Sequence, residues 1–513
     1  MLARIFSGAL IGIDAYRVEV EVDIAQGLPQ FSTVGLPEGA VKESKDRVKS
    51  AIKNSGYEFP ARRITINLAP ADIRKDGAAF DLPMAIGILV AMGVIPQKAA
   101  SRYLFMGEVS LDGRIKPVRG ILPVAVGARD WGLDGLIVAT ENAEEGAIVP
   151  SVPVYGLPDL GTLVTFLRGE INIPPCVIDP QEHSSQSTEY TDNFSEVRGQ
   201  EHVKRALEVA AAGGHNILMI GPPGSGKTML ARRLPTILPS MSFDEALETT
   251  KIHSIVGLLP CNRSLMTHRT FRSPHHSVSD AGLIGGGAIP RPGEVSLAHN
   301  GVLFLDELPE FKKNVLEMLR QPLEDGQVTI SRAATSLTYP ASFMLVSAMN
   351  PCPCGYLSDP THPCSCTPVI IQRYRSKISG PLLDRIDIQI EVPAVKYRDL
   401  VDRTDTEASE IIAGRVEACR SIQKERLSHS HSHSRIHCNA QMPARLIRKH
   451  CEPDEAGHRL LKLVTERLGL SARSYSRILK VARTIADLER SEHIREQHLA
   501  EAIQYRSLDR RMG

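Results

Sequence analysis

Apolar and polar positions alternate in two ways along the first third of this chain. Residues 17–24 and 63–68 alternate apolar and polar side chains with the two-residue period of a strand. Residues 37–55 and 82–92 place apolar side chains at the spacing of a helix. Because strand and helix patterns follow one another here, we predict a compact α/β domain over residues 1–167.

The pattern changes after residue 167. Residues 168–193 are polar, contain a Pro pair and show no apolar period, which is typical of a linker. Short apolar runs return in residues 194–397 and predict a second α/β domain. Residues 398–513 are polar and helical in pattern, so we predict a helical domain there.

Composition limits the classes of function. The chain has 513 residues, too many for one core, with a net charge of +1 and 23% charged residues. Without an overall basic field, contact with nucleic acid needs a local patch or a ring that concentrates such patches. Nine cysteines are an odd number and do not match a secreted disulfide framework. No run of about 20 apolar residues is present, so we expect a cytoplasmic protein without a membrane segment.

One apolar run ends in a glycine-rich loop. Residues 216–228 read NILMIGPPGSGKT, which contains the spacing G-x-x-x-x-G-K-T of a phosphate-binding loop. Glycines allow successive backbone N–H groups to turn towards a phosphate, Lys227 reaches the β- and γ-phosphates, and the Thr228 hydroxyl binds Mg²⁺. The residues assigned to the nucleotide in this loop are Gly221, Pro222, Pro223, Gly224, Ser225, Gly226, Lys227 and Thr228.

A second apolar run supplies two carboxylates. Residues 301–307 read GVLFLDE, a strand pattern that ends in Asp306 and Glu307. Asp306 is suited to hold the Mg²⁺ of a bound nucleotide. Glu307, on the opposite side of the strand end, is suited to polarise the attacking water. Together with the phosphate-binding loop, this run predicts hydrolysis of a nucleoside triphosphate.

The chain between these two motifs is longer than one helix and one strand require. It includes three consecutive glycines, Gly285 to Gly287, which we interpret as a mobile loop. It also includes the adjacent pair His275 and His276. Because adjacent side chains diverge in an extended loop, we expect this pair to make loop contacts rather than to bind a metal.

Residues 326–350 predict a hairpin followed by a buried strand that ends at Asn350. A polar side chain at this end, next in the sheet to the phosphate-binding strand, is placed to contact the γ-phosphate and the attacking water. Arg332, near the expected hairpin tip, is the best-placed single cation for contact with a polymer such as DNA in a central pore. A solvated hairpin arginine is the alternative.

Four cysteines follow among prolines. Their spacing is C-x-C-x9-C-x-C, and the residues are Cys352, Cys354, Cys364 and Cys366. Four thiols on loops that fold back suit a tetrahedral Zn²⁺ site. The spacing differs from the common C-x2-C pairs, so free thiols are the alternative.

Two segments of the first domain resemble a protease. The run RKDGAAFDLPMAIGIL from Arg74, followed by GEVSLDGRIKPVRGILPVA from Gly107, resembles the proteolytic domain of Lon. In that family a serine nucleophile and a lysine base occupy the positions that are Ala79 and Leu122 here. Because neither side chain is a nucleophile or a base, the resemblance implies a Lon-like fold without peptidase activity. Ring assembly and a binding surface are the alternative roles.

Other segments resemble AAA+ ATPases. The run SEVRGQ from Ser195 resembles the stretch that lies over adenine in that class, which implies ATP as the nucleotide. Asn350 matches the sensor-1 position. Within SGPLLDRID from Ser379, Arg385 matches the arginine finger that completes the active site of a neighbouring subunit.

A further resemblance lies near the end of the chain. The run LGLSARSYSRILKVARTIADL from Leu468 resembles the lid helix of AAA+ proteins, whose early arginine is sensor 2 for the γ-phosphate. Arg473 matches this position. Arg477 and Arg483 remain alternatives for the same role.

These segments cover nearly the whole chain and closely resemble the ComM/YifB family, often labelled magnesium-chelatase-like. The resemblance implies an AAA+ P-loop ATPase core with a helical lid, preceded by a Lon-protease-like α/β domain. It also implies a homo-hexameric DNA helicase that drives branch migration on single-stranded and branched DNA during natural transformation. The residues themselves support an oligomeric, Mg²⁺-dependent ATPase. The ATPase subunit of a metal chelatase and a protein remodeller are the alternatives.

Overall fold

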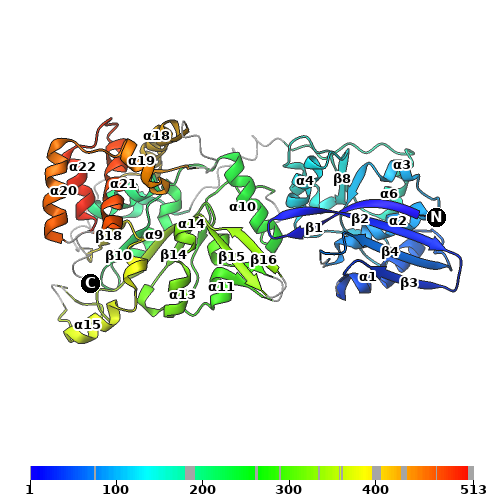
Figure 1. The fold of residues 1–513 in the computed structure, drawn as a ribbon, viewed down its shortest axis with the longest axis horizontal. Coiled ribbons are helices and arrows are strands. Elements are labelled where there is room, and N and C mark those ends of the chain that lie inside the picture. Colours follow the sequence, from blue (N-terminus) through cyan, green and yellow to red (C-terminus); the bar gives the residue numbers. More distant parts are fainter. Residues whose placement is uncertain are drawn as a thin grey trace. The chain divides into compact units, whose positions relative to one another are not determined.

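Contacts divide the chain into two compact units (Figure 1). The first unit comprises Met1–Ser187 and Ala246–Thr267, and the second comprises Thr188–Glu245 and His268–Gly513. The computed structural model describes residues 2–37, 39–73, 75, 77–178, 191–259, 264–287, 290–332, 335–357, 359, 362–395, 406–428, 436–468 and 471–506. Residues 179–190 of the expected linker and the expected boundary at residue 397 lie outside this described part.

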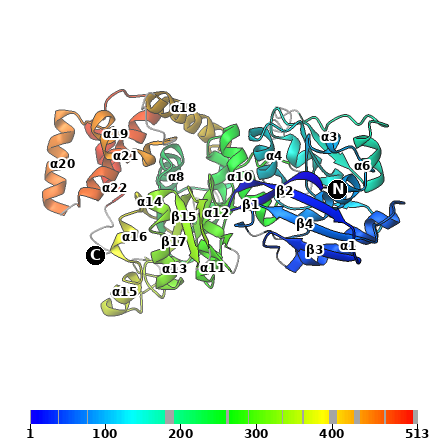
Figure 2. The same cartoon turned by 45° about the vertical axis from the view of Figure 1, so that its right-hand side comes forward.

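A seven-stranded sheet organises the first unit, in the order β3-β4-β2-β1-β5-β8-β9. Its strands are β1 (Leu2–Ile11), β2 (Asp14–Ala25), β3 (Gln30–Val34), β4 (Arg63–Ala69), β5 (Tyr103–Phe105), β8 (Gly135–Ala139) and β9 (Val154–Leu157). β2 buries every second side chain from Val18 to Ile24, because alternate side chains of a strand point to opposite faces. Figure 2 shows β1, β2, β4 and β3 as neighbouring strands. The strands expected at 17–24 and 63–68 are confirmed.

Helices and one small hairpin complete the first unit. They are α1 (Gly39–Asn54), α2 (Asp81–Ala91), α3 (Gln97–Ala100), β6 (Glu108–Val109), β7 (Ile115–Lys116), α4 (Ile121–Asp130), α5 (Ala143–Ala147) and α6 (Leu160–Leu167). Every residue of α2 is buried, as its nearly continuous apolar sequence requires. α1 and α2 confirm the helices expected at 37–55 and 82–92.

The second unit contains a five-stranded sheet in which every neighbouring pair of strands is parallel. The order is β11-β14-β17-β10-β18. Its strands are β10 (Ile217–Ile220), β11 (Phe271–Arg272), β14 (Val302–Leu305), β17 (Met344–Met349) and β18 (Ile388–Glu391). Because all strands run the same way, their carboxyl ends lie along one edge of the sheet. The phosphate-binding loop, Asp306 and Asn350 therefore all leave the sheet at that edge.

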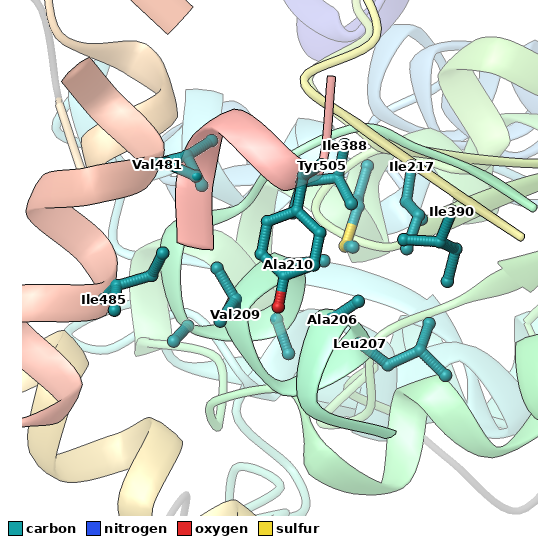
Figure 3. Close-up of a cluster of buried hydrophobic side chains, with 14 of the residues drawn as sticks. Ala206, Leu207, Val209, Ala210, Ile217, Ile388, Ile390, Val481, Ile485 and Tyr505 are labelled. Carbon is teal, nitrogen blue, oxygen red and sulfur yellow. The ribbon is translucent and has the colours of Figure 1, made fainter. Parts of the chain in front are cut away.

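Helices surround this sheet and extend into a helical lid. They are α8 (Glu201–Gly213), α9 (Lys227–Arg233), α18 (Ser409–Ser428), α19 (Ala444–His450), α20 (Glu455–Leu468), α21 (Ala472–Leu488) and α22 (Glu496–Gln504). The helix α10 (Phe243–Val256) belongs for most of its length to the first unit. Figure 3 shows how α8 joins lid and sheet in one apolar cluster. Val209 and Ala210 of α8 lie among Ile217 of β10, Ile388 of β18 and Ile485 of α21.

Short elements of the second unit occur in the sequence between the strands of its sheet. They are α11 (Asp280–Ile284), β12 (Gly285–Gly286), β13 (Arg291–Pro292), α12 (Glu294–Leu297), α13 (Lys313–Met318), α14 (Pro322–Asp325), β15 (Gln327–Arg332), β16 (Thr335–Pro340), α15 (Pro368–Arg375) and α16 (Gly380–Leu383). The antiparallel pair β15–β16 confirms the expected hairpin.

The expected mobile loop at Gly285 to Gly287 instead begins with a strand. β12 pairs antiparallel with β13, so Gly285 and Gly286 belong to a second short hairpin. A Cβ atom on Gly285 would lie 2.4 Å from the carbonyl oxygen of Arg291. The glycine is therefore required by close approach of the two backbones rather than by loop mobility alone.

Candidate active site

The phosphate-binding loop connects β10 to α9 and encloses its own lysine. Lys227 is buried, and its ammonium donates hydrogen bonds to the carbonyl oxygens of Gly221 at 2.8 Å and Pro222 at 2.9 Å. Burial lowers the pKa of Lys227, although Asp306 and Glu307 oppose the shift. The ammonium is thus held by neutral carbonyls, which an incoming phosphate can replace with charge.

Two glycines of this loop have separate structural reasons. A Cβ atom on Gly221 would lie 2.1 Å from the carbonyl oxygen of Val392, which follows β18. Gly226, just before α9, has a φ of 86°, in the left-handed region that favours glycine. These constraints explain why the loop needs glycine at both positions.

Thr228 and Asp306, the two residues expected to hold Mg²⁺, lie in direct contact. The Thr228 hydroxyl donates a hydrogen bond of 2.7 Å to one carboxylate oxygen of Asp306, and the other oxygen accepts from the backbone N–H of Glu307 at 2.9 Å. Adjacent hydroxyl and carboxylate oxygens beside a phosphate-binding loop are the donor set that Mg²⁺ prefers. The chemistry of these residues therefore fits a nucleotide-bound Mg²⁺.

Glu307 follows Asp306 at the end of β14. Its backbone is left-handed, with a φ of 52°, and its side chain is 56% exposed. The carboxylate lies 3.7 Å from the ring of His276. The carboxylate is accessible to a water molecule, as a residue that polarises the attacking water requires.

Asn350 lies beside the phosphate-binding loop, at the end of β17. β17 pairs with β10 so that Met349 lies opposite Ile220, and the side-chain oxygen of Asn350 is 3.4 Å from the Lys227 ammonium. The structure thus brings together Lys227, Thr228 and Asp306 with Asn350. Five side chains of one chain are expected at the nucleotide phosphates and the attacking water. These are four of them, and Glu307 is the fifth.

His275 and His276 do not diverge. Their ring centroids are 4.0 Å apart, because the chain turns here: the N–H of Val278 bonds to the carbonyl of His275. The expectation of divergence, which assumed an extended loop, was wrong. The contact between His276 and Glu307 was not foreseen, and nothing in the sequence spacing of these two residues indicates it.

Arg385 lies at the opposite edge of the sheet from the phosphate-binding loop of its own chain. Its carbonyl accepts a hydrogen bond from the side chain of Asn216, the residue just before β10. The four residues of β10 separate the two edges by about 13 Å. The Arg385 guanidinium is nearly buried, donates to the carbonyl of Pro381 at 2.7 Å and forms an ion pair with Glu324.

The three lid arginines differ in their contacts. Arg477 forms an ion pair with Asp387, and Arg483 donates to Asp487 at 3.0 Å and to the carbonyl of Glu492 at 2.7 Å. Arg473 is exposed and makes no hydrogen bond or ion pair within the described residues. Of the three, only Arg473 has a guanidinium available to a ligand.

A cavity of about 1030 Å³ connects Arg473 with Arg385. It lies at the amino edge of the sheet, and its lining includes Asn216, Met344 and Asp387 from the starts of the strands β10, β17 and β18. Arg473 therefore shares an edge with Arg385 and not with Lys227. This location distinguishes Arg473 from a sensor that reaches the nucleotide of its own chain.

Asp387 anchors this edge and was not foreseen as a functional residue. It accepts from the backbone N–H of Asn216 at 3.1 Å and lies 3.5 Å from the His215 ring. Burial opposes ionisation, but Arg477 and His215 outweigh it and hold the pKa of Asp387 well below its usual range. Burial lowers the pKa of His215. The site is therefore a buried anion neutralised by the lid.

The four expected metal-binding cysteines come together. Their sulfur atoms all lie within 4.8 Å of one another, with Cys352 to Cys354 at 3.3 Å and Cys352 to Cys364 at 3.7 Å. A tetrahedron with Zn–S bonds of about 2.3 Å separates its sulfurs by about 3.8 Å. The thiols of Cys352, Cys354, Cys364 and Cys366 therefore fit a Zn²⁺ ion.

The protease-like positions contain no catalytic chemistry. Ala79 lies in a 3₁₀ turn, and its carbonyl accepts from the N–H of Gly107. Leu122 is buried in the first turn of α4, and its backbone N–H donates to the Glu145 carboxylate at 3.0 Å. Arg74 and Asp76 of the same motif lie outside the described part of the chain. The two side chains present are a methyl and an isobutyl group.

Arg332 is exposed at the end of β15, and residues 333–334 of the hairpin tip lie outside the described residues. The hairpin packs against the shorter hairpin β12–β13: the Tyr339 hydroxyl donates to the carbonyl of Pro290 at 2.8 Å. Arg291 of β13 is also exposed. Two adjacent hairpins thus each present an arginine.

No described helix has the length and apolar character needed to cross a lipid bilayer.

Comparisons with known proteins agree along the chain. Three family models match: "Magnesium chelatase, subunit ChlI" over residues 193–400, "Subunit ChlI of Mg-chelatase" over residues 20–142, and "Magnesium chelatase, subunit ChlI C-terminal" over residues 406–506.

Two relatives match nearly the whole chain, and a third matches only part of it. Competence protein ComM of Haemophilus influenzae is 44% identical over 511 residues, covering 99% of this chain and 98% of the relative. Protein YifB of Salmonella typhimurium is 44% identical over 510 residues, with the same coverage. Lon protease 2 of Bacillus subtilis is 30% identical over 151 residues, 28% of this chain and 27% of the relative.

Proposed function

Because the chain belongs to the ComM/YifB family of magnesium-chelatase-like AAA+ proteins, we propose that it is an ATP-dependent, hexameric DNA helicase. In this proposal it promotes branch migration in the cytoplasm, extending the joint between an incoming single strand and the chromosome during natural transformation. The relative named as a competence protein supports this assignment.

The convergence of Lys227, Thr228, Asp306 and Asn350 carries the proposal of ATP hydrolysis. Lys227 exchanges its loop carbonyls for the β- and γ-phosphates, and Asn350 orients the γ-phosphate from the neighbouring strand. Mg²⁺, held by Thr228 and Asp306, would neutralise charge on the phosphates. Glu307 polarises the attacking water from its exposed position.

The distance of Arg385 and Arg473 from their own phosphate-binding loop supports a ring. A residue at the amino edge of the sheet serves catalysis only at the nucleotide of another subunit. We therefore assign Arg385, as arginine finger, and Arg473, as sensor 2, to the γ-phosphate of a neighbouring subunit. Repetition of one such heterologous contact closes a ring when its rotation is a whole fraction of a turn.

The two adjacent hairpins support DNA as the substrate. Arg332 and Arg291 are exposed cations on β15 and β13, on a chain whose net charge is only +1. Contact with phosphates is independent of sequence, which suits a motor that must hold every base equally well. We expect binding to weaken steeply as salt rises, with little difference between sequences of equal length.

The cysteine cluster is proposed as a structural Zn²⁺ site. Its four sulfurs have the separation that a tetrahedral ion requires, and the loop carrying them begins two residues after Asn350. Bound Zn²⁺ would cross-link this loop, which follows β17 and Asn350 in the sequence.

The ATPase subunit of a metal chelatase is the second candidate, favoured by the descriptions of the three matching family models. The two proposals predict different stimulants of hydrolysis. A helicase hydrolyses ATP faster with single-stranded DNA, whereas a chelatase subunit responds to its partner subunits and not to DNA.

The deciding experiment measures ATPase rate with and without single-stranded DNA, together with displacement of a labelled strand from forked and three-stranded substrates. We expect DNA to stimulate hydrolysis and ATP to drive displacement. Glu307→Gln should bind the substrate and displace nothing, and Arg332→Ala should lower DNA-stimulated turnover more than basal turnover. A rate indifferent to DNA, with no displacement by assembled rings, would refute the helicase and favour the chelatase.

A further inference from the structure

The Arg385 guanidinium is already paired with a carboxylate of its own chain. Only 9% of its side chain is exposed, and Glu324 and the carbonyl of Pro381 accept hydrogen bonds from its terminal nitrogens. Arg385, ahead of Arg473 and Arg477, lowers the pKa of Glu324. A finger that reaches another subunit's phosphate must first leave this carboxylate, because both anions compete for the same donors.

The position of the Glu324 carboxylate favours separation of its ion pair with Arg385. Its side chain is 57% exposed, so water can solvate it when the pair separates. A cleft of about 570 Å³ beside the pair is lined by Glu324, Arg385 and the β15 residues Val328 and Thr329. The ion pair therefore borders open space on the side of β15.

Glu324 is joined directly to the hairpin that carries Arg332. It lies on α14, which ends at Gly326 in the left-handed conformation and continues at once into β15. α14 and β15 lie side by side (Figure 2). The N–H of Ala341, just after β16, bonds to the carbonyl of Gly326 at 2.8 Å and closes the base of the hairpin. A displacement of the hairpin therefore moves the short helix that holds the finger.

We propose that Glu324 is a positioning residue that restrains Arg385, and that DNA bound at the β15–β16 hairpin withdraws Glu324 and frees Arg385 for the neighbouring subunit's ATP. The inference rests on the proposed function and adds its regulation. Glu324 is the resting partner of the finger, and the γ-phosphate is its working partner. Hydrolysis is thereby coupled to the presence of DNA through one contiguous segment, residues 322–332.

The test is the variant Glu324→Gln, measured for ATPase activity with and without single-stranded DNA. Removing the charge weakens the restraint, so we expect basal kcat to rise about threefold or more towards the DNA-stimulated rate. The ratio of stimulated to basal turnover should fall towards one. The effect should fall on kcat rather than on the KM for ATP, because an arginine finger stabilises transition-state charge and Glu324 itself contacts no nucleotide in this proposal. DNA affinity should rise, because coupling is reciprocal and DNA no longer has to separate the ion pair.

Glu317→Gln is the matched control. Glu317 lines the same cleft and carries the same charge, but its ion-pair partner is Arg320, at 2.9 Å. We expect wild-type basal and stimulated rates. Glu324→Asp, which keeps the charge, should stay closer to wild type than Glu324→Gln. A merely structural role predicts the reverse of the main result, namely a lower unfolding temperature and a lower basal rate.

Three outcomes would overturn the inference. If Glu324→Gln has the basal rate of wild type, Glu324 does not restrain Arg385. If its basal rate falls as in Arg385→Ala, Glu324 aligns Arg385 for catalysis instead. If the basal rate rises equally in Glu317→Gln, the effect comes from the loss of any negative charge in the cleft and not from the pair of Glu324 with Arg385. Failure of the proposed function is seen separately, in wild-type protein that ignores DNA or in Arg385→Ala that hydrolyses ATP normally.

Discussion

Single residues at the phosphate-binding edge have separable tasks. Lys227 is held by loop carbonyls and contacts Asn350, whereas Glu307 stands apart from them and is exposed. Under the proposed mechanism, binding of the phosphates and polarisation of water therefore depend on different side chains. Substitution of one should leave the task of the other measurable.

Glu307→Gln should bind ATP and Mg²⁺ with near-wild-type affinity and hydrolyse at least about 100-fold more slowly, because the water loses its carboxylate while the phosphate cradle stays intact. Lys227→Ala should instead weaken nucleotide binding. Fluorescent-nucleotide titration and single-turnover hydrolysis separate the two effects. Near-wild-type turnover in Glu307→Gln would remove that residue from the mechanism.

At the scale of elements, α21 has two arginines with different consequences. Arg477 neutralises the buried Asp387 at the start of β18, and so fastens the lid to the sheet. Arg473 lies four residues earlier, exposed and facing the cavity that Arg385 also lines. Both arginines are basic residues on one helix, yet only Arg477 is part of the packing between lid and sheet.

Arg477→Ala should therefore lower the free energy of unfolding by about 3 kcal/mol, because it leaves a buried carboxylate without its cation. Arg473→Ala should change it by less than about 0.5 kcal/mol and still reduce ATPase activity. Denaturant unfolding and ATPase assays of the two variants make the comparison. Equal loss of stability in both would place Arg473 in the packing as well.

The cysteine loop is a second element whose integrity has a specific test. The purified, untagged protein should contain about one Zn²⁺ per chain, bound by the four thiolates. Cys352→Ser or Cys364→Ser should lose the metal and lower local stability, as measured by elemental analysis and hydrogen exchange over residues 350–375. Cys419→Ser, at a buried cysteine outside the cluster, is the control. Zinc-free wild-type protein would refute the site.

At the scale of the whole molecule, no single chain contains a complete catalytic site under the proposed mechanism. The phosphate-binding edge carries Lys227, Thr228 and Asp306, and the opposite edge carries Arg385 and Arg473. Activity must then depend on assembly and on protein concentration.

Mixing Lys227→Ala protein with Arg385→Ala protein tests this dependence. Each variant alone should lose most activity, with Arg385→Ala down by about 10³-fold or more. In mixed rings an intact phosphate-binding loop meets an intact finger at about a quarter of the interfaces, so activity should recover towards that fraction. Mixed rings that form, as shown by subunit exchange, but recover nothing would contradict a role between subunits.

Sequence alone determined the residues whose chemistry is local. The phosphate-binding loop, the run ending in Asp306 and Glu307, and the strand ending at Asn350 are contiguous stretches, in which residue type and backbone conformation are set by near neighbours. Alternating patterns likewise predicted β2, β4, α1 and α2 within a few residues. Parallel strands then required Asp306 and Asn350 to meet at one edge.

Only the tertiary structure decided which distant residues meet. The ion pairs of Arg385 with Glu324 and of Arg477 with Asp387 join positions 61 and 90 residues apart. Residues 246–267 join the first unit, although they lie between motifs of the second. Such contacts follow from how complementary surfaces pack after the chain folds back, and no local period records them. The sequence therefore predicted the phosphate-binding residues, and packing decided the surroundings of each arginine.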